Sequence, residues 1–333
     1  MIEILAIPPL ATVQDLGREG YWSQGLGRAG AMDRRALAIS NLLLGNAPNA
    51  PALEIPLTPA RLRFTKRTAF ALVGATCCAR LSGRPLPAVW VGFAEEDALL
   101  ELGSMTTGAL VYLALPGGMD VPKVLGSHST QLREAFGGYD GRVMAPGDIL
   151  CGARSDALAL PTAGLSIAIP PLREIGETAI QLRALPSAEE PGFTEASRTE
   201  FWSSEWEVSR DVNRMGYRLS GPTLERATTG ELRSHGIVPG IVQVPGGGQP
   251  IIQLADSATM GGYPKIAAVI EADLWRVAQA RPGDRLRFVR VDLAQAAEAE
   301  RKADNEIDNL RTALRHASEL HEKWGDHAVA HRS

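Results

Sequence analysis

The chain has 333 residues, a formal net charge of -4 and a hydrophobic content of 45%, which is ordinary for a soluble globular protein. The scattered arginines form no basic stripe and aromatic residues make up only 5%, so the sequence argues against a nucleic-acid-binding surface. It also lacks an apolar run of 18 residues, which argues against a membrane-spanning helix.

The first 292 residues are dominated by short apolar runs between glycines and prolines. Runs of this length predict strands of barrels or sandwiches. The clearest are residues 70–83, 109–118, 164–171 and 241–256. The pairs Gly117-Gly118 and Gly261-Gly262 are expected to supply positive φ where strands reverse.

Three short helices are expected between the strands. Residues 31–46 carry apolar residues on one face, and Gly45 offers a left-handed stop. Thr194 is a candidate N-cap for a second helix, and Asp273 is a candidate N-cap for a third.

The C-terminal segment differs from the rest of the chain. Residues 293–324 contain neither Gly nor Pro and predict one helix about 48 Å long. Its seam predicts either packing along its own chain or a docking helix for a partner or a second copy. The seam residues, spaced by fours and threes, are Ala303, Ile307, Leu310, Leu314, Ala317, His321 and Trp324.

Two segments share one order of turns and suggest two related halves. Each Gly-Gly pair is followed by a Pro-Lys step and then by a Pro-Gly-Asp turn, at residues 146–148 and 282–284. We therefore expect an N-terminal β-rich half, a C-terminal β-barrel half, and a helix with a tail, at residues 1–165, 166–292 and 293–333.

Cysteine usage indicates a reducing compartment. Cys77, Cys78 and Cys151 show no metal-ligand spacing, so no metal site is expected. The N-terminal residues lack the features of a signal peptide, and the expected location is the cytoplasm.

Residues 254–266, LADSATMGGYPKI, hold the richest set of candidate site residues. Asp256, Thr259, Tyr263 and Lys265 surround a glycine pair that lets a ligand approach the backbone closely. The alternative is an ordinary turn between two strands.

Three further segments carry candidates, each with a structural alternative. In TVQDLGREG, Asp15 and Arg18 would face one ligand, or form a local turn with its own salt bridge. In RDVNRMGYRL, Arg214 beside Tyr217 would bind a carboxylate or phosphate, or be solvated. His235 follows Ser234 in a loop-like context and would be either a site residue or a surface histidine.

Several of these segments together resemble the biotin-dependent carboxyltransferase-like family. They are TVQDLGREG, GAMDRRALAISNLLLGN, GGMDVPKVLGS, NRMGYRLSGP, LRSHGIVPGIVQVP and GGYPKIAAVIEADL with PGDRLRF, and the resemblance covers about residues 2–292. It implies a mainly β fold with two barrel-like, cyclophilin-like halves, a few helices and the long C-terminal helix. One departure is Ala258, where the family commonly has Gln.

Within the family, the resemblance points to the C component of an ATP-dependent 5-oxoprolinase, which opens 5-oxoproline to L-glutamate. It implies two partners, a Kip-inhibitor-type B component and a lactam-utilisation-type A component. It also implies that ATP is held by the complex. No Met-Lys-Met signal occurs, so no biotin is expected on this chain. The predicted catalytic residues are Asp256 and His235, and the predicted substrate-binding residues are Asp15, Arg18, Asp33, Arg214, Tyr217, Thr259, Tyr263 and Lys265.

Two alternatives remain open from the sequence. One is a urea- or allophanate-type carboxyltransferase component that uses biotin carried on another chain. The other is a regulatory binding protein that antagonises a kinase inhibitor.

Overall fold

The computed structural model describes residues 1–57, 59–154, 164–173, 176–227, 230 and 232–330, with side chains described up to residue 319. The chain forms two compact units. The first contains Met1–Gly17, Arg34–Pro170 and Asp304–Ser333, and the second contains Arg18–Asp33 and Pro171–Ala303. This division differs from the expected halves, because residues 18–33 belong to the second unit and the terminal helix is divided between the two.

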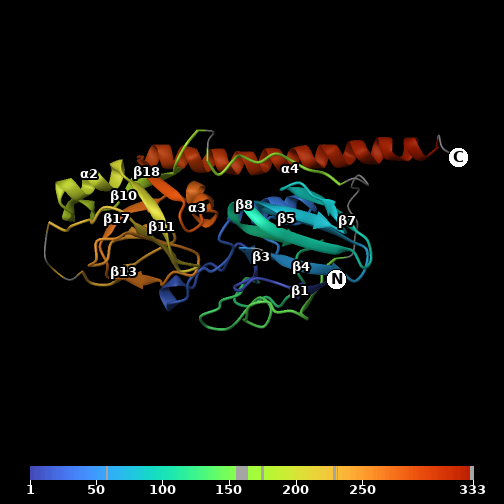
Figure 1. Cartoon of the computed structure of the whole chain (residues 1–333), viewed down its shortest axis with the longest axis horizontal. Coiled ribbons are helices and arrows are strands. Elements are labelled where there is room, and N and C mark those ends of the chain that lie inside the picture. The colour runs from blue at the N-terminus through green and yellow to red at the C-terminus, as the bar shows by residue number, and fades with distance from the viewer. Residues whose placement is uncertain (58, 155–163, 174–175, 228–229, 231, 331–333) are drawn as a thin grey trace. The chain divides into compact units, whose positions relative to one another are not determined.

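The first unit is built on a nine-stranded sheet (Figure 1). Its longest strands are β5 and β8, which pair antiparallel along most of their length. They include most of the predicted run at 70–83 and the first six residues of the run at 109–118. The strands are β1 Ile2–Ala6, β2 Thr12–Gln14, β3 Ala52–Pro56, β4 Ala60–Phe64, β5 Thr68–Leu81, β6 Arg84–Pro85, β7 Trp90–Ala94, β8 Leu99–Ala114 and β9 Ile149–Leu150.

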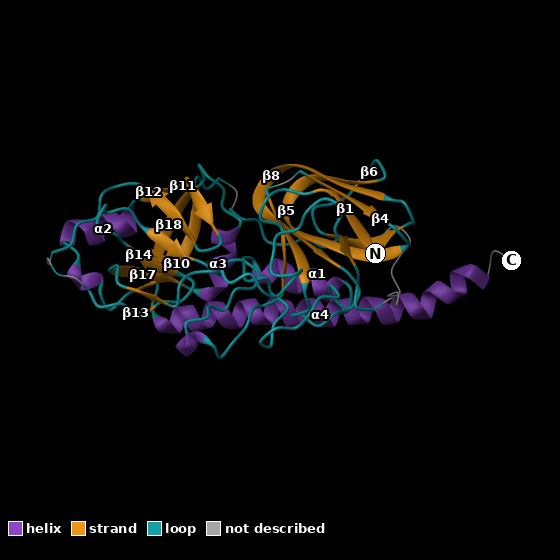
Figure 2. Ribbon diagram, turned by 90° about the horizontal axis from the view of Figure 1, so that it is seen from below, coloured by secondary structure: helices purple, strands orange, loops and turns teal. Residues whose placement is uncertain are grey.

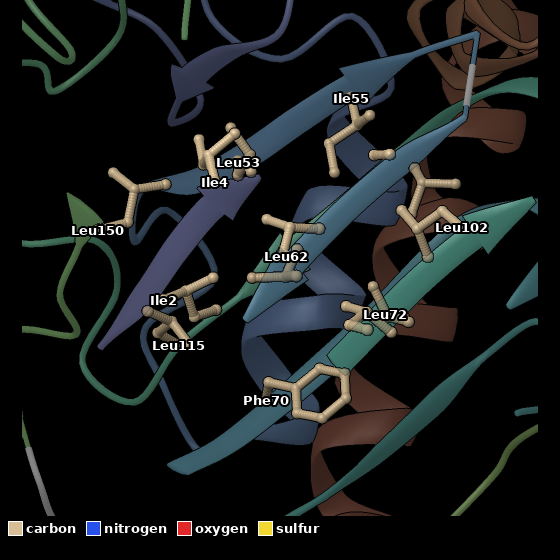
Figure 3. Close-up of a cluster of buried hydrophobic side chains, with 14 of the residues drawn as sticks. Ile2, Ile4, Leu53, Ile55, Leu62, Phe70, Leu72, Leu102, Leu115 and Leu150 are labelled. Atoms are coloured by element: carbon tan, nitrogen blue, oxygen red, sulfur yellow. The ribbon is translucent and has the colours of Figure 1, made fainter. Parts of the chain in front are cut away.

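The core of the first unit lies on one face of this sheet. In β4, apolar residues alternate with exposed arginines, so that Leu62 and Phe64 are fully buried. Figure 3 shows side chains from β1, β3, β4, β5 and β8, including Ile4, Leu53 and Phe70, gathered in this cluster. Burial of this apolar surface is the main stabilising contribution in the unit.

Helix α1, Arg34–Leu43, packs against β5 and β8 of the same unit. Its C-terminal stop is the predicted one, because Gly45 has φ 68° and its N–H donates to the Leu42 carbonyl. Asn46 then fixes the following turn by donating to the Leu115 carbonyl at 2.8 Å.

The second unit contains a closed barrel of seven strands in the order β10-β17-β14-β15-β12-β11-β18 (Figure 2). A parallel pairing of β10 with β18 closes it. Together with the open sheet of the first unit, the barrel confirms the mainly β fold class. The strands of the second unit are β10 Ile180–Pro186, β11 Glu205–Asn213, β12 Gly216–Ser220, β13 His235–Gly236, β14 Ile241–Gln243, β15 Ile251–Gln253, β16 Met260–Gly261, β17 Lys265–Val269 and β18 Arg285–Arg290.

The helices of the second unit are short. The 3-10 turns η1, Trp22–Gln24, and η2, Glu190–Gly192, accompany α2, Glu195–Ser203, and α3, Glu271–Ala278. Thr194 caps α2 as predicted, since its hydroxyl accepts from the Ser197 N–H. The predicted cap of α3 was wrong. Ile270 occupies the N-cap, and Asp273 lies in the first turn, where its carboxylate binds the Arg183 guanidinium.

The two predicted turn repeats behave differently. In both Pro-Gly-Asp turns the glycine has positive φ, and the aspartate side chain accepts the N–H three residues back, at 2.7 Å for Asp148 and 2.8 Å for Asp284. The Gly-Gly corners are not alike. Gly117 and Gly118 have positive φ, whereas Gly261 and Gly262 do not, so the second corner was predicted wrongly.

Helix α4, Leu293–Ala330, confirms the long C-terminal helix. Of its predicted seam, Ala303, Ile307, Leu310 and Leu314 are half-buried and Ala317 is exposed. The side chains at 321 and 324 lie outside the described residues. No helix in the described part of the chain is long and apolar enough to cross a membrane.

Candidate active site

Three ionisable side chains meet on the barrel of the second unit. Lys265 Nζ lies 3.7 Å from Glu189 Oε1 and 3.5 Å from His235 Nδ1. His235 Nε2 lies 2.7 Å from the same Glu189 oxygen. Lys265 and His235 were both predicted site residues, and the structure brings them together with Glu189, which was not predicted.

The backbone holds Glu189 and Lys265 in register. The Lys265 N–H donates to Glu189 Oε2 at 2.9 Å, and the Lys265 carbonyl accepts from the Ser187 hydroxyl at 2.6 Å. An irregularity in the β14–β17 ladder leaves Ile266 unpaired and sets Lys265 opposite Gln243. Bulges of this kind redirect side chains next to functional sites. Here the bulge places Lys265 and Gln243 on one face of the sheet.

Lys265 is buried although it is cationic. Its side chain is only 5% exposed, and its Nζ donates to the carbonyls of Gly261 and Tyr263 at 3.4 Å each. Burial lowers the pKa of Lys265, while the Glu189 carboxylate opposes that shift. The ammonium group is therefore costly to keep charged, and an anionic oxygen beside it would be stabilised strongly.

His235 links the buried lysine to the surface, with 47% of its side chain exposed. Its Nδ1 lies 3.0 Å from the Arg233 carbonyl, and its Nε2 faces Glu189. Nδ1 also lies 3.5 Å from the Lys265 ammonium, so this nitrogen faces both an acceptor and a donor. His235 is placed to exchange a proton with a substrate atom, while Glu189 orients the ring.

Tyr263 and Thr259 lie in the strand connection around this cluster. Tyr263 is 54% exposed, and its carbonyl accepts from Lys265. Thr259 is half-buried, and its carbonyl accepts from the Ile237 N–H. Met260 and Val238, each two residues or fewer along the chain from β13 or β16, are also exposed, at 58% and 48%.

Asp256 and Arg214 form a separate ion pair in the same unit. Arg214 donates to both carboxylate oxygens of Asp256, at 2.8 and 2.9 Å, and to the Gly30 carbonyl at 2.6 Å. Each side chain of the pair is only 9% exposed. The bond to Gly30 fastens residues 18–33 to the barrel. This geometry favours a structural role, and the catalytic role of Asp256 stays a prediction.

Asp33 and Tyr217 lie at the C-terminal end of α3, again within the second unit. Asp33 accepts from the Gln279 amide at 2.7 Å, and the Tyr217 hydroxyl is 3.4 Å from the Ala278 carbonyl. Both residues are buried, at 3% and 6% exposure. Their hydrogen bonds connect them to α3, and none of those described connects them to Lys265.

Asp15 and Arg18 fall into different units. Asp15 is a hub of the first unit, because its carboxylate accepts from the Ser127 and Ser129 hydroxyls and from the backbone N–H groups of His128 and Gly17. The bond to Gly17 is the local turn that the sequence left open as an alternative. Arg18 is buried, and its backbone N–H donates to the Arg28 carbonyl.

Sequence reasoning missed Glu189 and Gln243. Glu189 lies 76 residues before Lys265 and follows the serine of the PSAEE turn, with no motif around it. Gln243 is a polar residue within an apolar run, IVQVP, at the end of β14. Such a glutamine, placed opposite a predicted site strand, was the one available signal.

Comparison with known proteins gives a consistent result along nearly the whole chain. The family model "Carboxyltransferase domain, subdomain A and B" matches residues 24–290. The chain is 41% identical to the C component of the 5-oxoprolinase of Escherichia coli (strain K12) over 317 residues, 94% of this chain and 99% of that protein. It is 42% identical to the corresponding Haemophilus influenzae component, covering 93% of this chain and 98% of that protein.

Longer proteins share the same region. The urea amidolyase of Saccharomyces cerevisiae is 33% identical over 93% of this chain, which spans 18% of that protein. The crystal structure of the K. lactis urea amidolyase superposes with a TM-score of 0.82 at 30% identity, covering 93% of this chain and 20% of that one.

Proposed function

The chain belongs to the family of carboxyltransferase domains with subdomains A and B, and from that premise we propose that it is the C component of an ATP-dependent 5-oxoprolinase. The observation that carries the proposal is the end-to-end similarity to two proteins named as this component of 5-oxoprolinase, each covered over at least 98% of its length. The amidolyase relatives are several times longer, and this chain spans only 18% of the first.

The names of these two relatives designate one part of a larger enzyme, which implies that the chain works in a complex of several different polypeptides. We propose the partners expected from the sequence, a Kip-inhibitor-type B component and a lactam-utilisation-type A component. ATP would be held by the complex, and this chain would carry no biotin. The cytoplasmic location stays a prediction.

The chemistry of lactam opening fits the Lys265 cluster. An amide carbonyl is a poor electrophile, and transfer of the γ-phosphoryl group of ATP to its oxygen makes the carbon susceptible to water. Lys265 would stabilise negative charge on the oxygen atoms at this centre. The phosphorylation releases ADP, and hydrolysis to the carboxylate releases inorganic phosphate. When the carbon–nitrogen bond breaks, the leaving nitrogen needs a proton, and His235, held by Glu189, would supply it.

The direct test is reconstitution of this chain with its two presumed partners. We expect ATP hydrolysis that 5-oxoproline stimulates, with glutamate as product, and no stimulation when this chain is left out. An assembled complex with no lactam-stimulated turnover would remove the proposal.

One alternative has a specific observation behind it, the 33% identity to a urea amidolyase. The reconstituted complex distinguishes this alternative from the 5-oxoprolinase proposal when carboxyl transfer and inhibitor binding are measured beside ATP hydrolysis. Carboxyl transfer to urea from a biotin-bearing chain would establish a carboxyltransferase component instead, and inhibitor binding without any turnover would establish a regulatory protein.

A further inference from the structure

The side chain of Gln243 is buried beside Lys265, and its amide N–H group donates no hydrogen bond within the part of the chain that the structure describes. Gln243 is only 3% exposed, and its Oε1 accepts from the Gln253 side chain at 3.0 Å, which fixes the orientation of the amide. Its Nε2 has no hydrogen-bond partner among the described residues. An unsatisfied buried donor is destabilising, so a donor of this kind calls for an explanation.

The unsatisfied donor points to the same place as the Lys265 ammonium. Gln243 and Lys265 are register partners on β14 and β17, so their side chains leave the sheet on one face. Lys265 Nζ reaches the Gly261 carbonyl at 3.4 Å, and a Cβ built on Gly261 would lie 2.7 Å from Gln243 Nε2. The neutral donor Gln243 Nε2 and the cationic donor Lys265 Nζ thus both lie next to Gly261.

Gly261 covers both donors from a small ribbon that is easily displaced. Strands β13 and β16 contribute two residues each and pair through two register positions, His235 with Gly261 and Gly236 with Met260. Elements with so few backbone hydrogen bonds open at low free-energy cost. Movement of Gly261 on β16, with His235 of β13 still held by Glu189, would uncover Gln243 Nε2 and Lys265 Nζ together.

We propose that Gln243 is a substrate-binding residue whose amide N–H donates to an oxygen atom of the lactam, next to Lys265. The assignment rests on the proposed function, because it takes the lactam as the ligand. Two converging donors match the two lone pairs of a carbonyl or carboxylate oxygen. A site of this kind loses binding energy sharply when one partner is absent, because the remaining buried groups are left unpaired.

The proposal predicts a large effect on activity and a small effect on stability. In Gln243→Met, kcat/KM for 5-oxoproline should fall about 10²-fold in the reconstituted complex. The Tm of the chain should change little, because the substitution removes an unpaired buried donor but also removes the acceptor of the Gln253 amide. A glutamine with a purely structural role would give the reverse, a lower Tm with kcat/KM unchanged.

Two further variants keep the test decisive. Gln243→Glu has nearly the same shape but replaces the donor with an acceptor, so it should lose at least as much activity even if the Met variant folds poorly. Gln249→Met is the matched control. Gln249 is a half-buried glutamine of the same unit that bonds the Gly221 backbone, and its loss should leave kcat/KM unchanged.

The outcomes separate this assignment from the proposed function. A wild-type complex without lactam-stimulated ATP hydrolysis would overturn the function and this assignment with it. An active wild type with equally active Gln243→Met and Gln243→Glu complexes would overturn the assignment alone.

Discussion

The second unit contains two buried ion clusters that satisfy their charges in different ways. In the Arg214–Asp256 pair, two parallel hydrogen bonds join a guanidinium to a carboxylate, and a third fastens residues 18–33. In the Lys265 cluster, the ammonium has one carboxylate at 3.7 Å and carbonyls at the edge of hydrogen-bonding distance. The first arrangement is typical of a structural brace, and the second leaves charge available for a ligand.

Breaking the brace should give the largest effect on stability. Arg214→Met leaves the Asp256 carboxylate buried without its partner, and loss of one member of a buried pair costs about 3–5 kcal/mol. Chemical denaturation of the isolated chain measures this loss. The double variant Arg214→Met with Asp256→Leu should recover much of the loss, because no lone charge remains. If the single variant unfolds at the wild-type denaturant concentration, the pair is not a brace.

Removing the carboxylate of the other cluster should act on chemistry instead. Glu189→Gln keeps the shape but weakens the orientation of His235, and we expect kcat to fall about 10²-fold, the lower end for general acid–base catalysis. Because Glu189 opposes the burial effect, its neutralisation should lower the pKa of Lys265 further. Titration of the lysine by NMR would show the shift. A rise in that pKa would contradict the electrostatic account.

The pH dependence of stability should give the smallest signal. Burial lowers the pKa of Lys265 in the folded chain below the unfolded value of about 10.4. The unfolded state therefore binds more protons between these two values, and stability contributed by this residue rises with pH through that window. The free energy of unfolding of wild type, relative to Lys265→Met, should increase as pH is raised toward 10.4. A decrease would mean that Glu189 outweighs burial.

The parts of the molecule that depend on local sequence patterns were predictable, and those that depend on tertiary contacts were not. The apolar runs that became β5 and β8, the Thr194 cap and the Gly45 stop follow from local patterns, and each was confirmed. The position of Asp273 was misjudged because tertiary bonding to Arg183 overrides its capping preference.

The candidate site was only partly accessible from sequence. Lys265 and His235 were predicted as site residues because they lie in glycine-containing segments with excess polarity. Glu189 was not predicted, since only the pairing of β10 with β17 brings it to Lys265, and the bulge at Ile266 that aims Lys265 at Gln243 has no local signature. Asp256 looked equally functional in the sequence, and its bidentate pairing with Arg214 became visible only in three dimensions.

The most direct test of the central claim is the rate of glutamate formation by the reconstituted complex that contains Lys265→Met. The matched control is Lys66→Met, which alters an exposed lysine of the first unit. We predict that Lys265→Met lowers kcat by about 10²–10³-fold with assembly intact, the loss expected when one donor to a developing charge is removed. A Lys265→Met complex that assembles and forms glutamate at the wild-type rate would contradict the account.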